Sequence, residues 1–108
     1  MSTRDNRKWD AVVLNPLDQV ATALGNLSAG QSVRVRSGEV VEVIVLAEDI
    51  PLCHKFAVRV VAQGGVIHKY GEAIGAASID IAIGRHVHVH NLKSLRAQRN
   101  QLNKNSPS

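Results

Sequence analysis

The chain has 108 residues, of which 44% are hydrophobic and 3% aromatic, and its formal net charge is +4 at pH 7. This length suits one domain, and the single cysteine excludes an internal disulfide and fits a reducing compartment. Much of the basic excess lies in the two polar ends, which argues against a nucleic-acid-binding face. The first ten residues lack the apolar core of a signal peptide and no run is long enough to span a membrane, so we expect a cytoplasmic protein.

The first half of the chain is expected to be β-structure, because β-branched residues dominate and glycines punctuate them. Residues 9–14 and 18–24 are predicted strands, although a helix also suits the second segment. Between residues 33 and 45, valine first alternates with arginine, then a Ser-Gly pair is followed by a valine-rich run. This pattern predicts a β-hairpin.

The second half is less regular. Residues 56–62 fit either a strand or a short helix, and residues 66–70 are a predicted strand. Gly71 and Gly75 are expected to bracket a loop, and residues 76–79 then lead into a last turn.

Four segments share one pattern: an apolar residue, two spacers, Gly, two spacers and a second apolar residue. They are residues 27–33, 50–56, 61–67 and 81–87, with Cys53 in the Gly position of the second. Asn26, Asp49 and Asp80 stand directly before three of them. We interpret each segment as a tight turn that opens a strand, in which Gly adopts a positive φ and the Asn or Asp bonds to nearby backbone amides. Chance spacing of small residues is the alternative.

The two ends are expected to lie outside the domain. We predict a flexible arm at residues 1–8, a domain at residues 9–92 and a basic polar tail at residues 93–108. Leucines recur at near-helical spacing from Leu92 onward. The tail therefore either gains order by docking on a partner or stays disordered.

Residues 84–91 contain three histidines that alternate with two valines. In a strand, His86, His88 and His90 share one face, close enough for two rings to bind one metal ion or one anion. The alternative is a half-buried strand with its valines in the core and its histidines in water.

Two further segments combine chemically active side chains. Cys53, His54 and Lys55 follow a predicted turn, but neighbours on a strand point to opposite faces, so the thiol and imidazole are poorly placed to act as a pair. An incidental cysteine is the alternative, and Lys55 can hold a carboxylate. Lys69 and Tyr70 supply a cation and a phenol, which suit an anionic hydroxy-acid, although tyrosine also serves cores and interfaces.

Three ordered motifs resemble the small subunit or N-terminal domain of the altronate/galactarate dehydratase family, and the small subunit of sulfolactate sulfo-lyase is similar. The motifs are residues 50–58, 66–75 and 80–92, and residues 15–24 fit the opening of the family. The likeness covers residues 9–92. It departs at Cys53, where the family usually has Gly; at a positive φ, a cysteine costs roughly 1–2 kcal/mol.

The resemblance implies a SAF-type β-clip fold in a separate small subunit that works with a larger catalytic subunit. Family members eliminate water or sulfite from polyhydroxy or sulfonated carboxylic acids with a divalent metal. We therefore expect a subunit of a hydro-lyase that acts on a sugar acid or related hydroxy-acid with Fe²⁺, or alternatively with Mn²⁺ or Mg²⁺.

The resemblance also implies the site residues. The expected metal ligands are His54, His88 and His90. Lys55, Lys69 and Tyr70 are expected to bind the substrate, and Lys69 and Tyr70 to be catalytic. Two alternatives stay open: a sulfolactate sulfo-lyase-type subunit, and a non-catalytic SAF module that binds a sugar acid or a protein partner. The isolated chain can also form a homo-oligomer.

Overall fold

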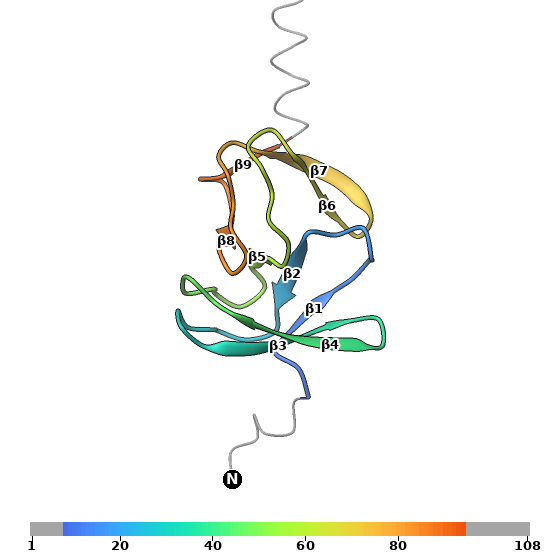
Figure 1. The fold of residues 1–108 in the computed structure, drawn as a ribbon, viewed down its shortest axis with the longest axis vertical. Coiled ribbons are helices and arrows are strands. Elements are labelled where there is room, and N and C mark those ends of the chain that lie inside the picture. Colours follow the sequence, from blue (N-terminus) through green and yellow to red (C-terminus); the bar gives the residue numbers. More distant parts are fainter. Residues whose placement is uncertain (1–7, 95–108) are drawn as a thin grey trace, which may run out of the picture.

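The computed structural model describes residues 8–94, which form nine β-strands and no helix, and therefore no helix that could cross a membrane (Figure 1). The strands are β1 (Ala11–Val13), β2 (Val20–Ala23), β3 (Ser32–Ser37), β4 (Val40–Val45), β5 (Lys55–Ala57), β6 (Val66–Lys69), β7 (Glu72–Ala77), β8 (His86–Val87) and β9 (Leu92–Ser94). The expected mainly β fold is confirmed.

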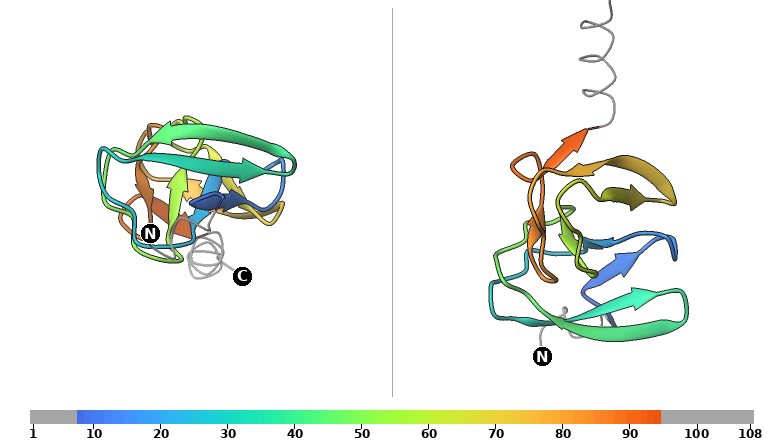
Figure 2. Two further views of the ribbon diagram at one scale, coloured as in Figure 1. Left: turned by 90° about the horizontal axis from the view of Figure 1, so that it is seen from below. Right: turned by 45° about the horizontal axis from the view of Figure 1, so that its top comes forward.

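The strands form two sheets. One has six strands in the order β4-β3-β1-β2-β5-β8, and the other has three in the order β6-β7-β9. Within the described residues β1 and β3 pair in parallel and the other ladders are antiparallel. Figures 1 and 2 show the β3–β4 hairpin at one end of the module and the three-stranded sheet at the other. Strands β5 and β8 therefore lie between these two ends.

Two buried clusters hold the sheets together. The first is formed by side chains of the six-stranded sheet and of the turns that adjoin it, and it contains the fully buried Phe56. The second groups Ala57 and Val87 of β5 and β8 with Ile67 and Ala77 of the second sheet. Burial of apolar side chains from both sheets fixes β5 and β8 against the rest of the module.

The predicted hairpin is confirmed as β3 and β4, whose register pairs Val33 with Ile44 and Val35 with Glu42. Along β3, Val33 and Val35 are buried and the intervening arginines are exposed, as alternation along a strand requires. Residues 18–24 and 56–62, for which a helix was the alternative, contain strand β2 and the end of strand β5.

Two predictions about the second half are wrong. The expected loop between Gly71 and Gly75 is strand β7, which pairs with β6 and β9. Strand β8 ends at Val87, and the chain then turns through residues 88–91 instead of continuing as a histidine-lined strand. The buried amide of Asn91 stabilises this turn: its Oδ1 accepts the His88 N–H at 3.0 Å and its Nδ2 donates to the His86 carbonyl at 2.8 Å.

The four repeated segments are real turns, here named turns 1 to 4 for residues 27–33, 50–56, 61–67 and 81–87. Their Gly-position residues all have a positive φ: Gly30 82°, Cys53 71°, Gly64 84° and Gly84 89°. The leading residues of turns 1 and 2 pair in an isolated bridge, and so do those of turns 3 and 4. The turns are therefore arranged as two reciprocal pairs.

The Asn and Asp residues before the turns cap the partner turn and not their own. Asp49 accepts the N–H of Ala29 in turn 1, and Asn26 accepts the N–H of Leu52 in turn 2, each at 2.9 Å. Asp80 caps turn 3 in the same way at 2.7 Å. The position that would cap turn 4 holds Val60. The expected bonding of these side chains is confirmed, with the added finding that it crosses between turns.

The structure describes the chain two residues beyond the predicted end of the domain at residue 92. The first three residues of the leucine-containing segment form β9, which pairs with β7. The remainder, residues 95–108, and the first seven residues of the arm lie outside the described residues.

Candidate metal centre

Three histidines meet at the junction of β5 and β8. In this ladder Phe56 pairs with His86 and Lys55 with Val87. His54 directly precedes β5 and His88 directly follows β8, so an extension of the same register places them opposite each other. His54 lies in turn 2 and His86 in turn 4. The pairing of β5 with β8 therefore brings together rings from two segments that are distant in the sequence.

The ring nitrogens converge. His54, His86 and His88 each offer one nitrogen, and these atoms all lie within 4.8 Å of one another. Nδ1 of His54 is 2.8 Å from Nε2 of His86. The ring centroids of His54 and His88 are 4.7 Å apart, and those of His86 and His88 are 5.3 Å apart with the rings nearly parallel at 8°. All three side chains are half-buried.

The surroundings of His86 and His88 favour neutral imidazoles. Burial, and then the charges of the neighbouring histidines, lower the pKa of His86 below its ordinary value of 6.5. Burial and neighbouring charges, with that of Lys55 among them, also lower the pKa of His88. A neutral imidazole has a free lone pair, which is the form that binds a metal.

This donor set fits a divalent metal. Ligand nitrogens about 2.0–2.1 Å from one ion lie about 3–3.5 Å from each other, so small ring rotations bring the observed nitrogens into that range. Imidazole nitrogens suit Fe²⁺ and Zn²⁺ better than Mg²⁺, which prefers oxygen ligands. Three protein ligands also leave coordination positions for a substrate.

Of the three predicted ligands, the structure brings His54 and His88 together and adds His86. His90 is exposed and its ring lies 5.7 Å from that of His86. Its role as a ligand stays a prediction. The sequence pattern did group His86 with His88 and His90, but it could not show that the strand ends at Val87 and turns His90 away.

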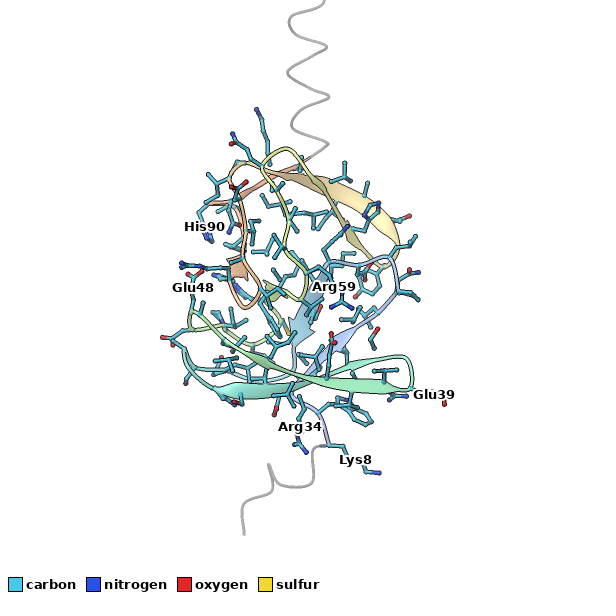
Figure 3. All side chains as sticks on the ribbon, viewed as in Figure 1. Lys8, Arg34, Glu39, Glu48, Arg59 and His90 are labelled. Atoms are coloured by element: carbon cyan, nitrogen blue, oxygen red, sulfur yellow. The ribbon has the colours of Figure 1, made fainter. Side chains whose placement is uncertain are left out.

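Glu48 is a further residue of the site that the sequence did not single out. Its Oε2 accepts the backbone N–H of His86 at 3.2 Å and lies 3.7 Å from Nη1 of Arg85. Glu48 and His90 lie on the same side of the molecule (Figure 3) and both line a surface groove of about 310 Å³. A negative charge here opposes the lowering of the pKa of His86.

The two predicted substrate-binding lysines interact electrostatically with each other, and Lys55 directly follows His54 in the chain. Lys55 is the first residue of β5 and Lys69 the last of β6. Burial, followed by the charge of Lys69, lowers the pKa of Lys55. Neither lysine forms an ion pair with a carboxylate in residues 8–94. Two half-buried cations without an acidic partner favour binding of an anion.

Tyr70 lies next to Lys69, whose Nζ is 5.3 Å from the phenol ring centroid. Its φ of 58° is unusual for tyrosine, and with Gly71 at 77° it forms the two-residue turn between β6 and β7. The buried carboxylate of Asp18 accepts both turn N–H groups at 2.9 Å. Asp18 therefore stabilises the strained backbone conformation of Tyr70, a kind of strain that is common at functional residues.

Comparison with known proteins identifies the family to which this module belongs. Residues 9–95 match the family model of the altronate/galactarate dehydratase SAF domain. Over 83 residues, 77% of this chain, it is 40% identical to an altronate dehydratase of Escherichia coli (strain K12) and 37% identical to one of Bacillus subtilis (strain 168). Those residues make up 16% of each relative, so the chain spans about one-sixth of their length.

A shorter relative matches part of the chain. This is the (2R)-sulfolactate sulfo-lyase subunit alpha of Paracoccus pantotrophus, 44% identical over 48 residues, which are 44% of this chain and 72% of the relative. The two kinds of relative thus carry the same module in a long and in a short polypeptide.

Proposed function

Since the chain belongs to the SAF-domain family of altronate and galactarate dehydratases, we propose that it is the metal-binding module of a hydro-lyase. The reaction removes water from a sugar acid or related hydroxy-acid. The observation that carries this proposal is the convergence of three imidazole nitrogens within 4.8 Å. Lys55 and Lys69, which form no ion pair with a carboxylate in residues 8–94, support it.

The histidines and the lysines have different proposed roles, which follow from their side-chain chemistry. His54, His86 and His88 hold a divalent metal, for which Fe²⁺ is the first choice. When bound, such an ion supplies Lewis-acid polarisation of the carboxylate or of the departing hydroxyl. Lys55 and Lys69 attract the substrate carboxylate.

Proton movement accompanies the elimination. A base takes the proton from the carbon α to the carboxylate, and the β-hydroxyl leaves as water after it gains a proton. We assign the donation of that proton to the phenol of Tyr70 or the ammonium of Lys69. We assign the base to a larger polypeptide, since Glu48, the carboxylate that contacts the backbone of His86, is paired with Arg85.

A larger catalytic partner follows from the same proposal. The altronate dehydratase relatives carry this module as only 16% of their length. We therefore propose that this chain works with a large dehydratase chain as its small subunit, in the cytoplasm.

A sulfo-lyase is the second candidate, because the chain is also 44% identical to a sulfolactate sulfo-lyase subunit alpha. The chemistry is closely parallel: sulfite in place of water leaves the carbon β to the carboxylate. The roles proposed for Lys55, Lys69 and the histidine cluster are the same whether water or sulfite leaves.

Reconstitution tests the proposal. The chain is mixed with a large dehydratase chain that resembles the remainder of altronate dehydratase, and turnover of altronate, galactarate and (2R)-sulfolactate is assayed with Fe²⁺. We expect activity only when both chains are present. A His86→Ala/His88→Ala variant should not support it, whereas His68→Ala, a histidine outside the cluster, should.

Sulfite release from sulfolactate without dehydration of the sugar acids would select the second candidate. Full activity of the large chain alone, unchanged by this module, would overturn the enzymatic proposal.

A further inference from the structure

We propose that the histidine face is a docking surface, on which the large dehydratase chain closes over the metal centre through an apolar collar. The collar consists of exposed Leu52, Ile79, Ile83 and Val89. This inference rests on the proposed function, since it names the surface through which that partner binds.

The four turns provide an internal comparison. The residue just before the positive-φ position is Ala29 in turn 1, Leu52 in turn 2, Gln63 in turn 3 and Ile83 in turn 4. All four turns have a positive φ at the next position, and turns 1 and 3 form with Ala29 and Gln63, so this kind of turn does not require a large apolar side chain there. Yet turns 2 and 4 expose Leu52 by 52% and Ile83 by 44%. These are the two turns that contain His54 and His86 of the histidine cluster.

The other two collar residues adjoin the site as well. Val89 lies between His88 and His90, and 84% of it is exposed. Ile79 is exposed and lines the groove that contains His90 and Glu48. Exposed apolar side chains gathered at one functional face mark an interaction site.

The large chain is the occupant that fits this surface best. The three histidines form half a coordination sphere on an open face, and elimination chemistry benefits when a partner excludes water. The base, which the proposed function assigns to the large chain, approaches the substrate from the open side of the metal centre. The altronate dehydratase relatives supply a body of the required size, since the module is only 16% of each.

A matched pair of valines tests the proposal. Val89→Lys places a charge in the collar, whereas Val43→Lys places one on strand β4 of the hairpin (Figure 1), where Val43 is 66% exposed. Affinity for the large dehydratase chain is measured by titration calorimetry, and folding of each variant is checked by thermal unfolding. Leu52→Lys serves as a second collar variant.

We expect Val89→Lys and Leu52→Lys each to weaken binding by about tenfold or more, and Val43→Lys to leave it within about twofold. Weakening by Val43→Lys but not by the collar variants would place docking on β4 and overturn the proposal. A wild-type homodimer that Val89→Lys dissociates would assign the collar to a second copy and also overturn it. If the wild-type chain does not bind the large chain, the proposed function fails first.

Discussion

Nδ1 of His54 lies 2.8 Å from Nε2 of His86, although 32 residues separate them in the chain. At this distance one ring donates an N–H and the other accepts it, so at least one of the two is neutral. Protonation of both rings replaces this hydrogen bond with a repulsion between like charges. Acid should therefore disrupt the arrangement of these two rings.

Stability of the metal-free protein should fall between about pH 7 and pH 5 for this reason. The pKa values of His86 and His88 are lowered. Below pH 6.5 the unfolded chain therefore binds protons that the folded chain does not, and the free energy of unfolding decreases as pH falls. Urea unfolding in the presence of a chelator measures this slope. His86→Gln/His88→Gln should make it shallower, and an unchanged slope would contradict this account.

Replacement of Cys53 by glycine should stabilise the protein by about 1 kcal/mol. Its φ of 71° matches the glycines of the other three turns, and a Cβ is unfavourable there. Cys53→Ala keeps the Cβ and is the control, for which no such gain is expected. Thermal unfolding of the two variants compares them directly, and equal stabilities would show that the strain is not relieved by glycine.

The missing cap of turn 4 can be supplied. Val60 occupies the position that corresponds to Asp80, and it is exposed. Val60→Asp should let a carboxylate accept the N–H of Ile83 and stabilise the fold by about 0.5–1 kcal/mol. Asp80→Ala should destabilise it by about 1 kcal/mol through loss of the equivalent bond. Urea midpoints test both, and a destabilising Val60→Asp would disprove the proposed equivalence of the turns.

Tyr70 should show a trade-off between stability and activity. Tyr70→Asn places a residue that tolerates a positive φ before Gly71, which is a favoured pair for this turn, so stability should rise by about 1 kcal/mol. Loss of the phenol should lower the turnover of the reconstituted enzyme. Tyr70→Phe keeps the strain and removes only the hydroxyl. Undiminished turnover in both variants would exclude a role for the phenol in proton transfer.

Local patterns were sufficient to predict much of the fold. The alternation around Val33 and Val35 predicted the hairpin, and the repeated spacing predicted four turns whose Gly positions all have a positive φ. The position of Cys53 within that repeat was enough to anticipate its strained backbone. These features depend on residues that are close in the sequence, so a single sequence is enough to predict them.

Long-range features were harder to predict. The turn after Val87 depends on the buried amide of Asn91, and the Tyr70–Gly71 turn depends on Asp18, which is 52 residues from Tyr70. Glu48 reaches the site only because turn 4 packs beside it. Such contacts arise from the register of β5 with β8 and from the packing of the two sheets, neither of which has a local signature.

The measurement that tests the central claim most directly is metal binding by single-histidine variants of the full chain. Calorimetric titration with Mn²⁺ in air and Fe²⁺ under anaerobic conditions should give one equivalent for the wild type. His54→Ala, His86→Ala and His88→Ala should each weaken binding by about tenfold or more, His68→Ala should not, and His90→Ala shows whether the fourth ring also contributes. A wild-type chain that binds neither metal, or a His86→Ala variant that binds both like the wild type, would contradict the three-histidine metal centre.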